Sequence, residues 1–286
     1  MINSFMKVIG VITVIAVIVM GCDSVVDSDS NIPETVEVET FQSTSNSSHS
    51  TVIVTEDNIG DDWDANVVGD DSGYAFAQEF GAPTGLGDAA LLLYTEDDDQ
   101  ARAELGTGVL VPLSDVGSLD YWTYQPAGNP GNAAVAYKMY VTFEGGWTFL
   151  IYEPYWQNGT GDPAPVVAQE WQHWENMENG NWWSSRTAGD LDAGFGGPPF
   201  YTLADVLELH PDAVVGYIQL GIGSFNPDWT VLADGMTFSG TTYDFDLDQD
   251  QDPVAKVDCK DGGWEEAGFR NQGQCIRFVN TGQDSR

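Results

Sequence analysis

Aromatic side chains are the residues in this sequence whose types and spacing best suit a chemical role. They recur from Trp147 to Tyr155, and Trp156 follows directly in a polar loop. A second group is the pair at 182–183, whose two indoles must face opposite ways if the segment is a strand. Flat aromatic rings bind the apolar faces of sugars, while carboxylates and amides bind the hydroxyls. The candidate ligand-binding residues are therefore Trp147, Tyr155, Trp156 and Trp183.

Motifs for catalysis are missing from the sequence. It has no G-x-S-x-G elbow, no H-E-x-x-H pair, no phosphate-binding glycine loop and no E-x-D-x-x-E strand signature of retaining glucanases. Acidic residues number 45, so pairs of carboxylates are too common to indicate acid–base work. Of the three histidines, His173 shares a strand face with Trp171 by alternation, which favours a packing or platform role. We assign no catalytic residue.

The net charge is the most extreme bulk property. There are 45 acidic and 9 basic residues, a formal net charge of −36, and the basic residues between Val8 and Ala255 are Arg102, Lys138 and Arg186. A surface of this sign repels nucleic acid and anionic lipid headgroups, which excludes binding to a phosphate backbone. Two explanations stay open. One is adaptation to a salty medium, and the other is that some carboxylates hold calcium through oxygen ligands.

The stretch from residue 51 to 247 has the pattern of an all-β scaffold for these residues. Short runs rich in β-branched and aromatic residues alternate with Gly, Asp, Asn and Pro turns. Many strands at even spacing favour a jelly roll or β-sandwich, and Glu144-Gly145-Gly146 predicts a hairpin. The predicted strands are 51–55, 74–80, 89–94, 101–105, 109–113, 119–124, 133–143, 147–153, 166–174, 182–185, 213–221, 230–238 and 242–247.

One short helix interrupts the strands. Thr202 and Asp205 form a variant of the capping box, apolar residues follow at 206, 207 and 209, and Pro211 ends the run. Nothing similar recurs in the sequence, so this is not the crossover helix of a βαβ unit. His210 lies at the C-terminal end of the predicted helix, and we expect a structural role for it.

Alternating aspartates follow the last predicted strand. They occupy five positions from Asp244 to Asp252 and run into a polar linker at 248–254. An EF-hand loop starting at Asp246 needs Gly and Glu where the sequence has Gln251 and Val257. The run is therefore interpreted as a strand end that leads into a linker.

The N-terminus has the pattern of an export signal. Lys7 is the single charge ahead of an apolar run of about 13 residues that ends at Met20, too short to span a bilayer, which takes about 20. The run continues into Val19-Met20-Gly21-Cys22, which resembles the lipobox of bacterial lipoproteins. The resemblance implies that residues 1–21 are a signal peptide and that Cys22 carries lipid that anchors the chain to a membrane. Residues 22–50, rich in Ser, Thr, Asp and Asn, are expected to form a flexible tether.

The other two cysteines lie near the C-terminus. In an exported chain an even pair, Cys259 and Cys275, is most simply a disulfide. The flanking pattern C-K-x-G-G-W, followed by F-x-N-Q-G-x-C-x-x-F-V, resembles a short module that ends many secreted bacterial proteins. Ala267 stands where that family has an aromatic residue. The resemblance implies a small disulfide-clamped cap over residues 255–286, with no activity assigned to it.

The central region resembles extracellular bacterial domains with a jelly-roll fold, akin to carbohydrate-binding modules. The resemblance is carried by Ala89–Leu93, Tyr152-Glu153-Pro154, Trp171–Trp174, Trp182-Trp183, Leu203–Leu209, Pro211–Ala213, Ala233–Phe238 and Tyr243–Phe245. It implies a structural calcium ion held by Asp234, with Asp62 or Asp64 from the first strand region. Gly235 departs from the family, which has Asp or Asn there.

These patterns predict a surface-anchored lipoprotein whose jelly-roll β-sandwich, with one short helix and the clamped C-terminal module, binds an extracellular carbohydrate without catalysis. Two alternatives stay open: a polysaccharide lyase or hydrolase of the same fold, and a structural envelope protein with no small ligand. The expected location is the outer membrane or cell surface. Asp23 instead favours the inner membrane, because an aspartate directly after the lipidated cysteine retains enterobacterial lipoproteins there.

Overall fold

The computed structural model describes residues 49–158, 166–247, 256, 259–260, 262–267 and 269–283. The predicted signal peptide, Cys22, the tether up to residue 48 and the linker at 248–254 lie outside the described residues. Within the described residues, no helix has both the length and the apolar character needed to cross a bilayer.

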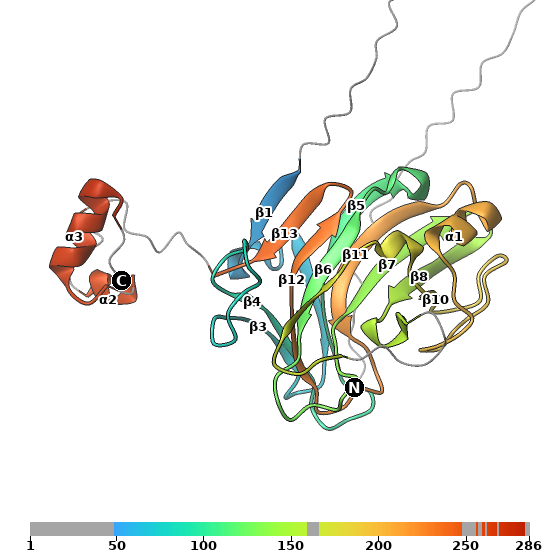
Figure 1. The fold of residues 1–286 in the computed structure, drawn as a ribbon, viewed down its shortest axis with the longest axis horizontal. Helices are drawn as coiled ribbons and strands as arrows, with labels where there is room; N and C mark the ends of the chain where they lie inside the picture. Colours follow the sequence, from blue (N-terminus) through green and yellow to red (C-terminus); the bar gives the residue numbers. More distant parts are fainter. Residues whose placement is uncertain are drawn as a thin grey trace, which may run out of the picture. The chain divides into compact units, whose positions relative to one another are not determined.

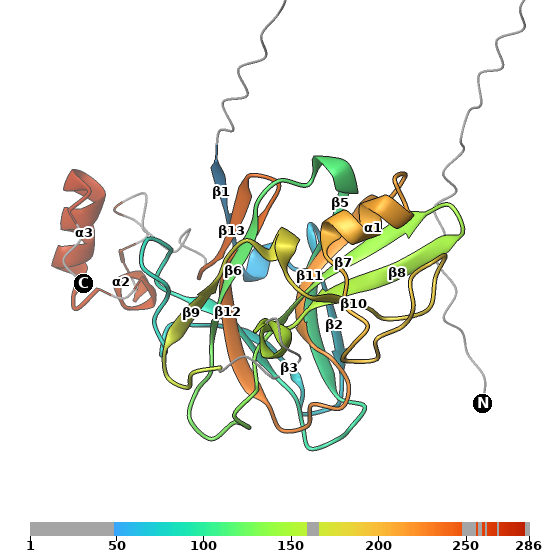
Figure 2. The ribbon, with the colours of Figure 1, turned by 45° about the vertical axis from the view of Figure 1, so that its right-hand side comes forward.

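Two sheets pack face to face to form a β-sandwich, which confirms the predicted fold class (Figures 1 and 2). Between the strands of the described residues, every pairing is antiparallel except that of β1 with β13. The seven-stranded sheet has the order β1 (Ser50–Val54), β13 (Thr241–Phe245), β12 (Thr230–Phe238), β4 (Ala90–Tyr94) and β3 (Gly73–Ala77), with β6 (Leu119–Tyr124) on β12 and β9 (Trp171–Trp174) on β6. The six-stranded sheet has the order β10 (Trp182–Ser184), β8 (Gly146–Tyr152), β7 (Ala136–Phe143), β11 (Val214–Ile222), β5 (Arg102–Pro112) and β2 (Trp63–Val68).

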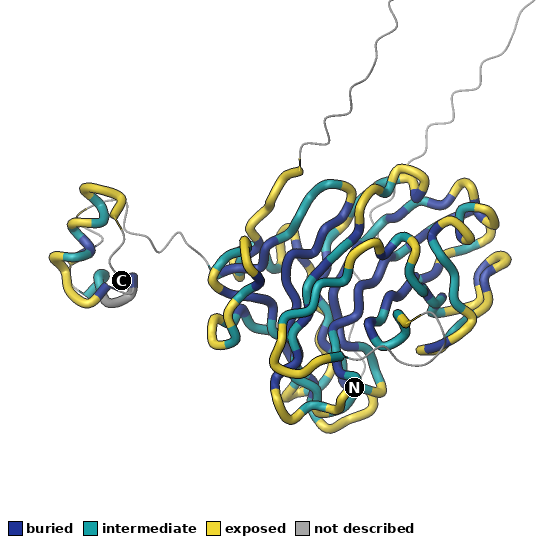
Figure 3. Tube along the Cα trace, in the orientation of Figure 1, coloured by how far each residue is buried: buried dark blue, intermediate teal, exposed yellow. Residues whose placement is uncertain are grey.

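The core lies between the sheets, where buried residues gather along the facing strands (Figure 3). It contains an aromatic cluster. Side chains alternate between the faces of a strand, so every second residue of each sheet points inward. Tyr137 from one sheet meets Tyr121 from the other at 5.6 Å between ring centroids, and Trp182 lies 6.0 Å from Tyr137. Such edge-to-face ring pairs contribute about 0.5–1.5 kcal/mol beyond the area they bury.

Several strands have other ends than predicted, as β9 does, which begins at Trp171 rather than at residue 166. Two strands differ from the prediction in more than their ends. β5 is one strand where two were predicted, because Gly106 and Gly108 stay within the pairing to β11 rather than forming a turn. A Cβ at Gly106 would lie 2.5 Å from side-chain atoms of Tyr217 and Gln219, so close packing explains that glycine. β2 was not predicted, because Asp64-Ala65-Asn66 lacks the β-branched residues typical of strands.

The predicted turn and helix are confirmed. β7 and β8 form a hairpin at Gly145 and Gly146, which have φ values of +101° and +157°. Helix α1 (Leu203–Leu209) begins with the capping box, in which Asp205 N donates to Thr202 Oγ1 at 3.1 Å and Thr202 N donates to the Asp205 carboxylate at 2.8 Å. His210 ends the helix, where its buried ring stacks on Phe143 at 3.9 Å. Its role in the fold is therefore packing.

The C-terminal residues contain two helices that the sequence analysis did not predict. They are α2 (Gly263–Glu266) and α3 (Gln272–Thr281), and α3 begins where Gln274 N donates to Asn271 Oδ1 at 3.0 Å. The predicted disulfide between Cys259 and Cys275 is confirmed. Around it lie buried Ala267 and Phe269. Short 3-10 turns elsewhere are η1 (Glu56–Asn58), η2 (Leu113–Asp115), η3 (Pro154–Trp156) and η4 (Met177–Asn179).

Candidate ligand-binding pocket

The outer face of the six-stranded sheet is hollow where two neighbouring strands carry very small residues. Ala136 on β7 pairs with Gly221 on β11, and both face away from the core. Ala134 and Gly223 continue the hollow past the ends of these strands. The result is a pocket of about 490 Å³. This volume falls within the range of roughly 300–1,000 Å³ that is typical of small-molecule sites.

Aromatic rings form the walls of this pocket. Trp156 meets Tyr155 edge to face at 4.7 Å, and its Nε1 donates to the carbonyl of Gly196 at 3.0 Å. The indole therefore lines the pocket and fixes the loop at its rim. The aromatic lining residues come from η3, β10 and two loops: Tyr155, Trp156, Trp183, Phe195, Phe225 and Trp229.

Two amides hold the turn that carries Trp156. Asn181 Nδ2 donates to the carbonyl of Trp156 at 2.6 Å, and Asn181 N donates to Gln157 Oε1 at 2.9 Å. Gln157 Nε2 in turn donates to the carbonyls of Glu153 and Asn181 at 2.9 and 3.0 Å. The loop before β10 is thereby connected to the turn after β8, which sets the position of the Trp156 ring.

Lys138 lines the pocket and takes part in a buried ion pair. Lys138 on β7 forms an ion pair with Glu104 on β5, and the two side chains are only 7% and 13% exposed. Burial alone would raise the pKa of Glu104, but the Lys138 ammonium and a hydrogen bond from Asn66 hold that pKa below its ordinary value. Glu104 is therefore ionised and paired at neutral pH.

Glu153 is the carboxyl group that lines the pocket itself. Burial raises the pKa of Glu153, and the Lys138 ammonium and the indole N–H groups of Trp183 and Trp156 oppose that rise only in part. Trp183 Nε1 is buried and makes no hydrogen bond of acceptable geometry within the described residues. The pocket thus contains a poorly compensated carboxyl group next to an indole N–H that is not well aligned to it, and both are able to bind a polar ligand.

Two phenylalanines at the rim have unfavourable backbone conformations. Phe195 and Phe225 have φ values of 49° and 69°, a region that bulky residues rarely adopt, and their side chains are 85% and 74% exposed. Both line the pocket. Such strain is concentrated at ligand-binding sites, where a side chain is held for contact rather than for packing.

The structure brings together three of the four predicted ligand-binding residues. Tyr155, Trp156 and Trp183 all line the pocket. Trp147 does not line it, although it is 41% exposed. Its ring instead packs against Tyr140 at 5.4 Å and under the Arg186 guanidinium at 4.1 Å.

Some of the pocket residues were missed by sequence analysis. Lys138 could have been found, since it is one of three basic residues in a long acidic stretch. Glu153 was placed on one strand face with Ile151, but both faces of this segment are apolar, so alternation alone does not show which one leaves the core. Phe195, Phe225 and Trp229 gave no signal, because their loops come to the pocket only through the fold.

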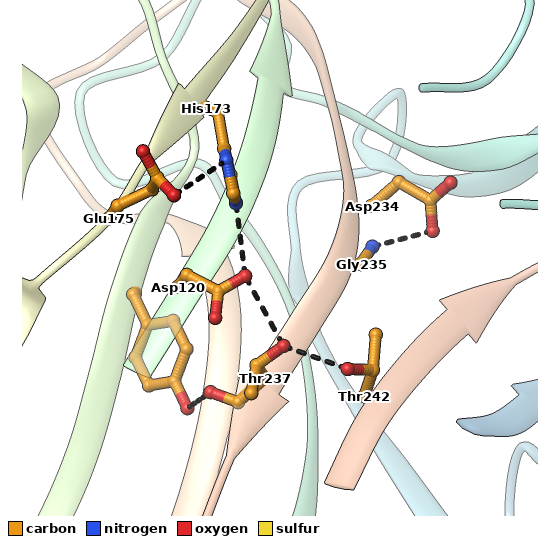
Figure 4. A network of polar contacts seen from close by, with 8 residues as sticks. Asp120, His173, Glu175, Asp234, Gly235, Thr237 and Thr242 are labelled. Carbon is orange, nitrogen blue, oxygen red and sulfur yellow. Dashed lines mark hydrogen bonds and ion pairs between the residues drawn. The ribbon is translucent and has the colours of Figure 1, made fainter. Parts of the chain in front are cut away.

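Asp234, the predicted calcium ligand, is fully buried on β12. Its Oδ1 accepts hydrogen bonds from Gly235 N at 2.7 Å, drawn in Figure 4, and from Phe245 N at 2.9 Å, while Oδ2 is buried without a partner. Burial raises the pKa of Asp234 to about 8, against the effect of these two backbone donors. The charges of Asp244 and Asp246 add to the rise.

The structure does not place Asp62 or Asp64 with Asp234. Asp64 lies on β2 of the other sheet, where its charge and that of Glu104 add to the burial that raises the pKa of Tyr217 to about 12. Asp62 immediately precedes β2, and its carbonyl accepts a hydrogen bond from Thr107 on β5. No three acidic, histidine or cysteine side chains of the described residues are arranged to hold a metal ion. Calcium binding therefore stays a prediction.

His173 lies on the seven-stranded sheet, in a polar network drawn in Figure 4. Its Nε2 is 3.0 Å from Asp120 Oδ1, and its Nδ1 is 3.6 Å from a Glu175 oxygen. Thr237 Oγ1 donates to the same Asp120 oxygen at 3.3 Å. The imidazole stacks on Trp122 at 4.2 Å with nearly parallel planes. His173 is thus a packing partner of an aromatic ring, as alternation with Trp171 indicated.

Similar proteins were found only by structure. No known protein family and no curated protein matches this sequence. The chain is similar to the family 11 carbohydrate-binding module of the cellulosomal cellulase Lic26A-Cel5E of Clostridium thermocellum, with 11% identity and a TM-score of 0.35 over 60% of this chain and 84% of that chain. It is also similar to the C-terminal family 22 carbohydrate-binding module of Clostridium thermocellum Xyn10B, with 12% identity and a TM-score of 0.32 over 63% and 86%. An enzymatically active domain of bacteriophage CBA120 tailspike protein 4 matches with 10% identity and a TM-score of 0.34 over 62% and 19%.

Proposed function

We propose that the β-sandwich binds an extracellular carbohydrate, without catalysis, in the pocket on the outer face of the six-stranded sheet. The observation that carries this proposal is the combination of aromatic walls with a carboxyl group in the floor of one hollow. Aromatic rings bind the apolar faces of a sugar ring. The carboxyl of Glu153 and the indole N–H of Trp183 can then bind its hydroxyls.

The charges in the pocket favour binding over hydrolysis. Most glycoside hydrolases use two carboxyl groups on either side of the scissile bond. Glu153 is the one carboxyl group among the described residues that line this pocket. Glu104, the next acidic residue across the sheet, is paired with Lys138 and accepts a hydrogen bond from Asn66 at 2.6 Å. A second carboxyl free to act on a ligand is therefore missing from the described lining.

The test is a titration of the purified full chain against a panel of soluble oligosaccharides. We expect saturable binding that weakens about two- to tenfold in Trp156→Ala, since a ring contact contributes about 0.5–1.5 kcal/mol and 1.4 kcal/mol corresponds to tenfold. Trp147→Ala is the matched control, because it removes an exposed indole outside the pocket. Equal loss in both variants, or steady release of sugar products, would contradict the proposal.

We also propose that the domain is displayed at a membrane, at the outer membrane or cell surface, through lipid on Cys22. The support is the apolar run that ends at Cys22 and the polar tether that follows it. Cells that express the full chain and a Cys22→Ser variant provide the test. The wild type should partition with the membrane fraction and the variant should not. Equal partition of both would contradict the anchor.

We further propose a structural calcium ion at Asp234. Its support is the buried Oδ2 oxygen, which has no partner, next to Asp244 and Asp246. Carboxylate oxygens of this kind are the ligands that calcium prefers. Calcium should raise the melting temperature of the chelator-treated chain, and less so in Asp234→Asn. If millimolar calcium leaves the melting temperature unchanged, the proposed calcium site is contradicted.

A further inference from the structure

Glu153 shares its counter-charge with a second carboxyl group. The Lys138 ammonium acts on both Glu104 and Glu153, while the Arg102 guanidinium acts on Glu104 alone of the two. Lys138 pairs directly with Glu104, whose pKa is lowered. Its effect on Glu153 is smaller, and burial keeps the pKa of Glu153 raised. Ionised Glu153 is therefore undercompensated in the ligand-free pocket.

The groups that face Glu153 do not supply the missing positive charge. Lys138 approaches from β7, and indole N–H groups come from Trp183 on β10 and Trp156 on η3. From the core side, the charge of Glu153 acts on Tyr121 of β6, which is neutral at ordinary pH. The two indole N–H groups are neutral and the Lys138 ammonium is shared with Glu104, so the Glu153 carboxylate can still pair with one more cation.

The aromatic walls favour such a cation. Tryptophan and tyrosine faces attract ammonium groups through the negative potential of the ring, and tryptophan does so best. Trp156, Trp183 and Tyr155 line the pocket together with Glu153. The whole chain, with a net charge of −36, adds a field that attracts cations and repels anions.

We propose that the ligand unit held in this pocket carries a protonated amino group that pairs with Glu153, which in the carbohydrate class means an amino sugar. This inference rests on the proposed function, because it specifies the kind of carbohydrate bound at the same site. A neutral sugar can donate hydroxyl hydrogen bonds to Glu153 but brings no positive charge to balance the Glu153 carboxylate. A uronic acid brings a second negative charge to the same place and is rejected.

The experiment compares sugars that differ in charge alone. The full chain is titrated at neutral pH, where most of the amine is protonated, with the amino sugar, the neutral sugar, the N-acetylated sugar and the uronic acid. Each is tested in the gluco and galacto configurations, as monosaccharides and as short oligomers. We expect the amino sugars to bind at least about tenfold more tightly than their neutral counterparts, and the uronic acids to bind most weakly.

Glu153→Gln decides whether that residue is responsible. The substitution keeps the size of the side chain and removes its charge, so the amino-sugar preference should fall to near parity. Glu208→Gln is the matched control, because it removes one exposed charge from α1, away from the pocket. The melting temperature of each variant checks that it folds.

The outcomes separate the two proposals. Amino-sugar preference that is lost in Glu153→Gln and retained in Glu208→Gln supports this inference. Neutral or acidic sugars that bind as tightly as amino sugars, or a preference that survives Glu153→Gln, overturn it and leave the proposed function intact. Failure of every sugar to bind the wild type overturns the proposed function, and this inference with it.

Discussion

Glu104 on β5 passes over Gly221 of the neighbouring strand β11 to reach Lys138 on β7. Gly221 pairs with Glu104 on one side and with Ala136 on the other. A Cβ at residue 221 would lie 2.7 Å from Glu104 Cγ and 3.1 Å from Glu104 Cβ. The ion pair and the hollow therefore depend on the same missing side chain. Gly221 therefore makes space both for the Glu104 side chain to reach Lys138 and for the hollow itself.

Gly221→Ala should destabilise the protein by about 1–3 kcal/mol, since the new methyl group displaces Glu104 in a packed site. Gly223→Ala is the control, because the nearest atom to its Cβ would be Lys138 Nζ at an ordinary 3.7 Å. Urea unfolding measures both. Equal free energies of unfolding for the two variants would mean that Glu104 does not pack over residue 221.

Lys138→Met should cost about 3–5 kcal/mol, because it leaves Glu104 buried without its partner. The double variant Lys138→Met, Glu104→Leu should recover most of that loss, since neither charge is then left alone. A double-mutant cycle on the free energy of unfolding checks this coupling. Strictly additive effects would show that the ion pair is not formed in solution.

Phe225→Gly should make the protein more stable and its ligand binding weaker. Glycine adopts the φ of 69° without strain, whereas phenylalanine at such a φ costs about 1–3 kcal/mol. The exposed ring contributes little to packing, so its removal should raise the melting temperature. Binding should weaken, because a wall of the pocket is lost. A lower melting temperature would show that the ring supports the fold instead.

Asp234 should make stability depend on pH in the chelator-treated chain. Burial raises its pKa from 3.8 to about 8, so the folded protein holds the proton more tightly than the unfolded chain does. The associated stabilisation is complete below the unfolded value, and it is lost as the pH rises through about 8. Asp234→Asn should therefore flatten the fall in the free energy of unfolding over this window, measured by urea unfolding at several pH values. An unchanged slope would contradict the raised pKa.

The fold could be predicted from the sequence where local patterns agree with the tertiary structure. β6 and β12 match their predicted ranges. Every second residue of β6 is buried, and β12 is buried along almost its whole length, and both patterns are typical of strands. β2 was missed because its pairing to β5 outweighs a poor local strand propensity. The prediction of two strands in place of β5 was wrong. Gly106 allows close packing against β11, and a glycine needed for packing looks the same in the sequence as a glycine in a turn.

The site could be predicted only in part. Trp156 and Trp183 were found because loops and consecutive tryptophans expose an indole by geometry alone. Trp147 has the same local pattern, but Tyr140 and Arg186 occupy its ring, and neither contact can be seen in the sequence. The ion pair of Glu104 with Lys138 joins residues 34 positions apart on strands that are not neighbours in the chain. Only the sheet order brings them together.

The indole N–H signals of Trp147, Trp156 and Trp183, followed by NMR during titration of the full chain with sugar, test the central claim most directly. If a carbohydrate occupies the pocket, the signals of Trp156 and Trp183 shift in a saturable way and that of Trp147 does not. Trp183 should shift most, because its buried N–H faces Glu153 without forming a hydrogen bond of acceptable geometry within the described residues. Saturable binding that shifts Trp147 alone, or shifts none of the three, would contradict a carbohydrate site in this pocket.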